Sequence, residues 1–219
     1  MERVGAGELP ETLRLARPGA MVAFAKQDAV AEGYGPAARA AREHGFQPIL
    51  RLAGGRAAVF HEGTMALAHA IPDHDPRPGI QRRFEQSAEL VARALRRLGV
   101  DARVGGVPGE YCPGGYSVNV AGERKLAGIG QRLIKDAAHV GAVVVATGEE
   151  RIRDVLVPVY EALGLSWRPA TAGSAGTPLD ELQAALSAEY AELYELVEWR
   201  LDEETLPLAR RHRAEHLAG

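Results

Sequence analysis

The chain has 219 residues, enough for one substantial core but short for two full domains. Hydrophobic residues make up 46% and charged residues 25%, and the formal net charge is -3, which excludes a general polycationic nucleic-acid binder. With Cys112 as its one cysteine, no intrachain disulfide can form. No run approaches the roughly 20 apolar residues of a membrane span, and the first ten residues carry no signal pattern. We therefore expect a cytoplasmic protein with a free thiol.

The first half of the chain predicts short strands around one short helix. Short apolar runs bounded by turn residues are typical of strands, and an alanine-rich segment that stops before a glycine is typical of a helix. The expected strands cover residues 20–25, 47–52, 57–60 and 64–71, and the expected helix covers residues 36–44. A longer helix is expected next, because apolar residues recur at gaps of four and three. They are Phe84, Ala88, Val91, Leu95 and Leu98, within residues 80–98.

The second half predicts a hairpin, a buried strand and terminal helices. Strands are expected over residues 100–104, 116–120, 125–130 and 140–146, with a hairpin turn at 121–123 and a glycine- and proline-rich loop over 105–115. The expected helices cover residues 149–163, 179–199 and 203–216. Residues 170–177 are expected to form a flexible joint. We therefore divide the chain into a domain over residues 1–170 and C-terminal helices over residues 171–219 that pack back on it.

Two motifs follow the second and third expected strands. The segment Arg51-Leu52-Ala53-Gly54-Gly55-Arg56-Ala57 pairs two glycines, which let the backbone approach a ligand closely, with arginines suited to phosphate or carboxylate. A tight turn with solvated arginines is the simpler interpretation. The segment His61-Glu62-Gly63-Thr64 lacks a second histidine four residues after the first, so a zinc-protease site is excluded. We expect no metal site.

Two further segments carry a nucleophile and a cation. Cys112 lies in the loop Gly109-Glu110-Tyr111-Cys112-Pro113-Gly114-Gly115, where a thiol is either a nucleophile or a small apolar side chain. Lys125 begins the strand Lys125-Leu126-Ala127-Gly128-Ile129-Gly130-Gln131, whose small residues leave room for a ligand. An ammonium group there would suit a phosphate, a carbonyl or an adenylate, although an exposed strand lysine is also consistent with the pattern.

In this order the motifs resemble the lipoate-protein ligase and octanoyltransferase family, whose catalytic domain is related to biotin-protein ligase. The resemblance rests on four segments between about residue 21 and residue 216. They are Arg51-x-x-Gly54-Gly55-Arg56-Ala57, His61-Glu62-Gly63, Lys125-x-x-Gly128-x-x-Gln131-Arg132 and His139-x-Gly141-Ala142. The resemblance implies an α+β fold of the class-II-synthetase and biotin-ligase type, with a mixed β-sheet flanked by helices.

The resemblance also implies roles for individual residues. The catalytic residues would be Lys125, in contact with the acyl carbonyl or adenylate phosphate, and Cys112. Acyl or adenylate binding would fall to the remaining motif residues, with Gly54 to Ala57 and Gly128 to Gln131 as walls of the acyl pocket. That set is Arg51, Gly54, Gly55, Arg56, Ala57, His61, Gly128, Gln131 and His139.

Some positions depart from the family pattern and leave two mechanisms open. Val140 and Ala142 replace a histidine and a threonine, Leu50 replaces the first of two arginines, and an Asn-Asp pair common in ATP-using ligases is absent. The first mechanism uses ATP with Mg²⁺ to make a lipoyl or octanoyl adenylate. The second needs no cofactor, because Cys112 receives an octanoyl group as a thioester and passes it to a lysine. In both, Lys125→Ala is expected to abolish activity.

The resemblance implies an enzyme whose partner is a lipoyl-accepting carrier, either a lipoyl domain or a glycine-cleavage H-type protein. An acyl carrier protein is an expected donor, and an accessory ligase subunit is a further possible partner. We expect no nucleic-acid partner and no membrane partner. One rival is a non-catalytic acyl-binding protein or a subunit of a split ligase, which the losses at Val140 and Ala142 favour. A biotin ligase is the other, but its usual Gly-Arg-Gly-Arg loop is not found.

Overall fold

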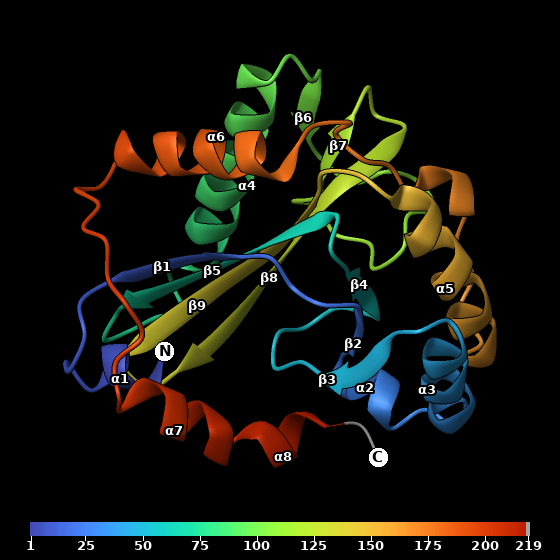
Figure 1. Cartoon of the computed structure of the whole chain (residues 1–219), viewed down its shortest axis with the longest axis horizontal. Helices are drawn as coiled ribbons and strands as arrows, with labels where there is room; N and C mark the ends of the chain where they lie inside the picture. Colours follow the sequence, from blue (N-terminus) through green and yellow to red (C-terminus); the bar gives the residue numbers. More distant parts are fainter. Residues whose placement is uncertain (218–219) are drawn as a thin grey trace.

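The computed structural model describes residues 1–217, and its largest element is a six-stranded antiparallel sheet (Figure 1). The strand order is β1-β5-β9-β8-β7-β6. The strands are β1 (Thr12–Ala16), β5 (Thr64–Pro72), β9 (Ala137–Val145), β8 (Arg124–Ile134), β7 (Val118–Val120) and β6 (Ala102–Val104). The long central strands β5 and β9 pair over their whole lengths, so they form the rigid base on which the other elements lie.

A second, three-stranded sheet has the order β3-β2-β4, with β3 (Gln47–Leu50), β2 (Met21–Phe24) and β4 (Ala58–Phe60). In this sheet β2 runs parallel to β3 and antiparallel to β4. The expected single mixed sheet is therefore two sheets, of which only the smaller one is mixed. The predicted α+β class, with sheet flanked by helices, is confirmed.

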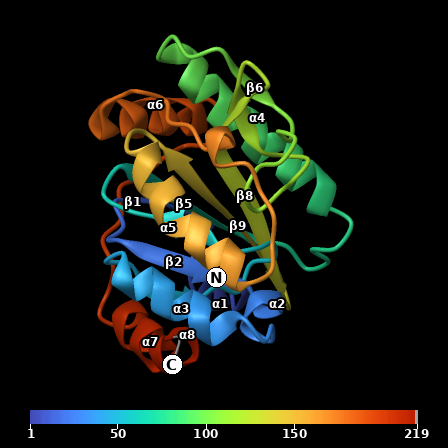
Figure 2. The same ribbon diagram turned by 90° about the vertical axis from the view of Figure 1, so that its right-hand side faces the viewer.

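The helices lie around the two sheets (Figures 1 and 2). They are α1 (Glu2–Gly5), α2 (Lys26–Ala29), α3 (Tyr34–Glu43), α4 (Ile80–Arg97), α5 (Glu149–Ala162), α6 (Leu179–Ala191), α7 (Thr205–Arg211) and α8 (Arg213–His216), with a 3₁₀ turn at Pro169–Thr171. Helices α4 and α6 share a core with the large sheet, whereas α3 and α5 share a core with the small sheet. Among the described helices, even the 18-residue α4 lacks a stretch apolar enough to cross a membrane.

Most elements predicted from periodicity are present, and the differences have local causes. The helix predicted over residues 80–98 is α4, and the hairpin predicted around residues 121–123 is formed by β7 and β8. Strand β1 was not predicted; it is an edge strand with no fully buried residue, so its apolar pattern is weak. The last two predicted helices are shorter than expected, since α6 ends at Ala191 and the terminal one divides into α7 and α8.

The prediction of a flexible joint over residues 170–177 is wrong. The Gly173 N–H donates to the Lys125 carbonyl at 3.0 Å, and the Ala175 N–H donates to the Val145 carbonyl at 2.9 Å. Ala172 is completely buried. The segment is held along the large sheet by backbone hydrogen bonds, which is the opposite of the exposed, weakly bonded backbone that makes a segment mobile.

The C-terminal elements pack on the rest of the chain at separate places. Leu182 and Leu186 of α6 are buried in the core of the large sheet. Arg3 next to the N-terminus forms ion pairs with Asp202 and Glu204, just before α7. The division into residues 1–170 and 171–219 stays a prediction.

Candidate active site

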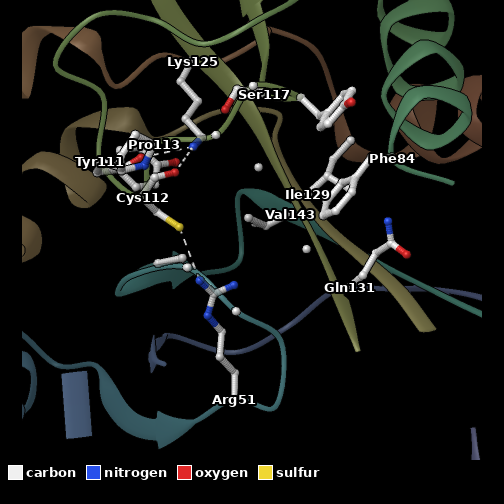
Figure 3. A pocket seen from close by; sticks show the side chains of 18 of the residues that line it. Arg51, Phe84, Tyr111, Cys112, Pro113, Ser117, Lys125, Ile129, Gln131 and Val143 are labelled. Carbon is white, nitrogen blue, oxygen red and sulfur yellow. Dashed lines mark hydrogen bonds between the residues drawn. The ribbon is translucent and has the colours of Figure 1, made fainter. Parts of the chain in front are cut away.

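The candidate site is a cavity of about 400 Å³ beside the edge of β8, within the size range of small-molecule pockets (Figure 3). Its position follows from the sheet. Strand β7 pairs with β8 only as far as Ala127, and no described strand covers that edge further along. The residues lining the space come from α4, β8, two loops and single positions of β4 and β9: Arg51, Gly54, Gly55, Ala58, Ile80, Phe84, Tyr111, Cys112, Pro113, Gly114, Gly115, Tyr116, Ser117, Lys125, Gly128, Ile129, Gly130, Gln131, Leu133 and Val143.

The Cys112 sulfur lies at the polar side of the cavity, between two hydrogen-bond donors. The Arg51 Nη2 donates to Sγ at 3.3 Å, and the backbone N–H of Arg56 donates to it at 3.2 Å. Both donors stabilise negative charge on the sulfur, and the thiolate is the nucleophilic form of cysteine. Cys112 also has a φ of 42°, a left-handed conformation that non-glycine residues adopt mainly where the surrounding structure imposes it.

The second glycine of the pair makes this contact between arginine and sulfur possible. Gly55 has a φ of 101°, and a Cβ added there would lie 2.6 Å from Arg51 Nη2 and 2.7 Å from Cys112 Sγ. The neighbouring Gly54 has open space around its position. The turn therefore needs a glycine at residue 55 for its backbone conformation and for the approach of the two side chains.

Tyr160 of α5 holds the backbone of the cysteine. Its hydroxyl accepts a hydrogen bond from the Cys112 N–H at 2.8 Å and donates to the Ala57 carbonyl at 3.0 Å. Burial raises the pKa of Tyr160 well above its ordinary value, so the hydroxyl keeps the proton that it donates. Sequence reasoning missed this residue, because nothing in a helical tyrosine 48 residues from the cysteine signals the contact.

Lys125 enters the cavity wall from β8 and is almost completely buried. Its Nζ donates to the carbonyls of Cys112 at 2.8 Å and Tyr111 at 3.1 Å, and it lies 3.6 Å from Glu110 Oε1. Burial is the main cause that lowers the pKa of Lys125, while the nearby Glu110 acts in the opposite direction. Gly128 leaves room for the lysine side chain, since a Cβ there would lie 3.3 Å from Lys125 Cε.

The other side of the cavity is apolar. Phe84 of α4 stacks on Tyr116 with ring centroids 5.1 Å apart, and Ile129 and Val143 project from the sheet nearby. Figure 3 shows Phe84 and Ile129 across the cavity from the Cys112 sulfur. A site with cations at one side and hydrocarbon at the other can hold a carboxyl-derived head group with an aliphatic tail.

The structure brings together most of the predicted site residues. Those that line the cavity are Arg51, Gly54, Gly55, Cys112, Lys125, Gly128 and Gln131. Arg56 contributes its backbone N–H, although its guanidinium turns away to Asp28 at 3.1 Å, and Ala57 lies behind the lining.

The two predicted histidines lie elsewhere, which differs from the expectation. His61 is buried in its own turn, where Nδ1 accepts the Gly63 N–H at 3.0 Å, and burial lowers its pKa. His139 lies on β9 opposite Ala70 and Arg132, and burial lowers its pKa to about 4. Neither lines the cavity: His61 is held in the turn between β4 and β5, and His139 projects from β9 at a position away from the lining.

Fold and cavity define an α+β protein with one thiol and one buried amine at the polar side of an apolar site. The family model for the lipoyl protein ligase A/B catalytic domain matches residues 1–183. The chain therefore belongs to this family, and the resemblance found in its motifs is confirmed.

Relatives and solved structures agree with this family. The chain is 31% identical over 161 residues to an octanoyl-GcvH:protein N-octanoyltransferase of Bacillus velezensis, covering 73% of this chain and 55% of the relative. It is 26% identical over 116 residues to a lipoyl-GcvH:protein N-lipoyltransferase of Listeria monocytogenes, covering 53% of this chain and 41% of the relative. The chain thus spans about half the length of the curated relatives it matches.

Among solved structures, a Thermoplasma acidophilum protein with bound lipoic acid has a TM-score of 0.72 at 20% identity, covering 94% of this chain and 82% of that one. A lipoate-protein ligase A bound with ATP has the same TM-score and identity, covering 98% of this chain and 87% of that one. These similarities show that the fold is shared.

Proposed function

We propose that this protein transfers an octanoyl or lipoyl group to a lysine of a carrier protein through a thioester on Cys112. The single observation that carries the proposal is the setting of the sulfur. It lies in the cavity wall, held by Arg51 and the Arg56 N–H, opposite an apolar region suited to an aliphatic chain. The relatives named as octanoyl-GcvH and lipoyl-GcvH transferases support the same chemistry.

The reaction has two steps. The Cys112 thiol loses its proton and the thiolate attacks the acyl carbonyl of the donor carrier. A C–S bond forms, the bond between the carbonyl carbon and the donor breaks, and the proton released by the thiol goes to the donor, which leaves as an amine, or as a thiol if the donor is a thioester of an acyl carrier protein. The acceptor lysine amine then attacks the thioester. The C–S bond breaks, an amide forms, and the proton lost by the amine returns to the sulfur. The Lys125 ammonium stabilises the negative charge that develops on the carbonyl oxygen.

Adenylation with ATP and Mg²⁺ is the alternative, and the residues of the cavity fit it less well. Magnesium is usually held by one or two carboxylates together with phosphates. No Asp or Glu is among the described residues that line the cavity. Two of the hydrogen bonds of Lys125 Nζ are made with the backbone around Cys112, so the ammonium serves the cysteine rather than an open phosphate site.

Intact mass spectrometry tests the proposal directly. The protein is incubated with octanoyl-GcvH, and separately with octanoyl-acyl carrier protein, and then with an acceptor lipoyl domain. We expect an octanoyl adduct that maps to Cys112 and disappears when the acceptor is added. Cys112→Ser keeps the size of the side chain and should abolish transfer, and Lys125→Ala should do the same. If Cys112→Ser kept full ATP-dependent acylation, the thioester mechanism would be wrong and adenylation would take its place. If the wild-type protein transferred no acyl group with or without ATP, a role as an acyl-binding protein or as a subunit of a split ligase would be favoured.

A further inference from the structure

A second buried charge, the carboxylate of Glu110, lies beside Lys125 and takes no part in the bond changes proposed above. The Glu110 side chain is completely buried and lies two residues before Cys112. Its Oε1 accepts hydrogen bonds from the Ser117 hydroxyl at 2.8 Å and the Gly114 N–H at 2.9 Å, and its Oε2 accepts the Val107 N–H at 3.3 Å. Burying a carboxylate is costly unless it is paired and hydrogen-bonded, and these contacts meet that requirement for Glu110.

The contacts of Glu110 hold the loop that carries the cysteine. Val107 comes before Cys112, and Gly114 and Ser117 come after it, so one carboxylate binds both arms of the loop. The loop needs such support, because Cys112 has a left-handed φ of 42°, which is unfavourable for a non-glycine residue.

The charge of Glu110 matters for Lys125 in a different way. The groups that face the Lys125 ammonium are Glu110, Cys112, Arg51 and the ring of Tyr111, whose centroid lies 5.0 Å from Nζ. Burial and Arg51 lower the pKa of Lys125, whereas Glu110 and the thiolate of Cys112 raise it. When the sulfur carries an acyl group it has no charge. Of the groups named, only Glu110 then remains as an anion to keep Lys125 protonated.

Resting on the relay function proposed above, we infer that Glu110 is a positioning residue with two roles. It holds the cysteine loop in its reactive conformation, and it keeps the Lys125 ammonium charged in the acyl-enzyme, where the second transfer step needs that charge. The first role should affect both steps, whereas the second should affect only the step after acylation.

The variant Glu110→Gln removes the charge and keeps an acceptor oxygen for Ser117 and Gly114, so most of the loop contacts remain. Only the longer contact with the Val107 N–H, at 3.3 Å, is lost, because an amide NH2 group cannot accept it. Acylation of Cys112 by octanoyl-GcvH should stay within about threefold of the wild-type rate. Transfer from Cys112 to the lipoyl domain should slow at least about tenfold at the upper end of the wild-type pH range, because losing the opposite charge lowers the pKa of the Lys125 ammonium and moves the upper pH limit of this step down. Glu123→Gln, which changes an exposed carboxylate in the β7–β8 turn, is the matched control and should leave both steps and the pH limit unchanged.

A second measurement does not depend on the folding of any variant. The chain has three lysines, Lys26, Lys125 and Lys135, so the ε-carbon signals of labelled lysine are few enough to assign by NMR. Lys125 should remain protonated near pH 8 after Cys112 is alkylated with iodoacetamide, which removes the charge of the sulfur.

The outcomes distinguish this inference from the relay itself. Absence of a Cys112 adduct in the wild type would overturn the relay, and the inference with it. A normal adduct, with an unchanged second step and pH limit in Glu110→Gln, would overturn the inference alone. If the variant does not fold, a neutral Lys125 in the alkylated wild type near pH 8 would also overturn it, and a protonated Lys125 would support it.

Discussion

The paired glycines give the sharpest test of the site, because the two residues differ in what surrounds them. In Gly55→Ala, the new Cβ would lie within 2.7 Å of both Arg51 Nη2 and Cys112 Sγ, well inside the 3.4–4 Å of ordinary contact. The end of an arginine side chain can move aside, so we expect the fold to survive. The variant should lose the hydrogen bond from Arg51 to the sulfur, and the sulfur itself should be displaced. In Gly54→Ala the added methyl group meets open space, and this variant is the control.

The magnitude follows from the contacts that are lost. The sulfur accepts two hydrogen bonds, and each hydrogen bond to a charged group contributes about 1.5–3 kcal/mol. Losing about 3 kcal/mol from the thiolate corresponds to roughly a 100-fold lower rate. The positive φ of residue 55 adds a backbone cost of about 1–3 kcal/mol in the alanine variant. For a chain of this size the melting temperature should fall by about 2–4 °C for each kcal/mol.

Two assays measure these effects. The alkylation rate of Cys112 by iodoacetamide reports the reactivity of the thiolate, and octanoyl transfer to a lipoyl domain reports the complete reaction. Both should fall about 100-fold in Gly55→Ala and stay near the wild-type values in Gly54→Ala. Equal rates in the two variants would refute the argument that the approach of Arg51 to the sulfur requires this glycine.

Three further changes test other parts of the structure. Phe84→Ala removes the aromatic wall that stacks on Tyr116, so kcat/KM should fall about tenfold with an octanoyl donor and less with a decanoyl donor. If the ratio of the kcat/KM values for these two donors stayed the same, the proposed position of the acyl tail would be contradicted. Arg83→Leu leaves the carboxylate of Asp73 without its partner at 2.7 Å and should lower the free energy of unfolding by about 3 kcal/mol in urea titrations, whereas a change of the exposed Arg82 to Leu should have little effect. The pKa of His139 is about 4 in the folded protein and about 6.5 when unfolded, so its contribution to stability is complete above about pH 6.5 and is lost, by up to about 3 kcal/mol, as the pH falls to about 4. His139→Asn should flatten this part of the pH dependence, and an equally steep loss in the variant would show that another group causes it.

Local patterns in the sequence were sufficient for the elements that lie in one part of the chain. The four- and three-residue spacing of apolar residues located α4, because one face of a helix must be buried whatever its partner is. The turn at residues 121–123 located the β7–β8 hairpin, whose strands are neighbours in the chain. The sequence pattern did not predict the edge strand β1, because a half-buried strand needs no continuous apolar run.

The candidate site was predicted in part. The ordered motifs indicated Arg51 and Lys125, and the glycine-rich loop indicated Cys112; all three lie in the cavity wall. The same motifs also suggested His61 and His139, which the fold places away from the cavity. A motif records which residue types occur together along a chain, but the direction of each side chain depends on strand register and twist, which no single segment contains.

The sequence by itself therefore determined the composition class, the main helices and strands, the family resemblance and the chemical types available for a site. Only the tertiary structure decided which of those groups meet. Arg51 reaches a sulfur 61 residues away, Tyr160 holds the same cysteine from α5, and Glu110 becomes a buried partner of Lys125. Contacts of this kind depend on the packing of elements distant in the chain and on the removal of water from between them. A linear pattern contains neither of these.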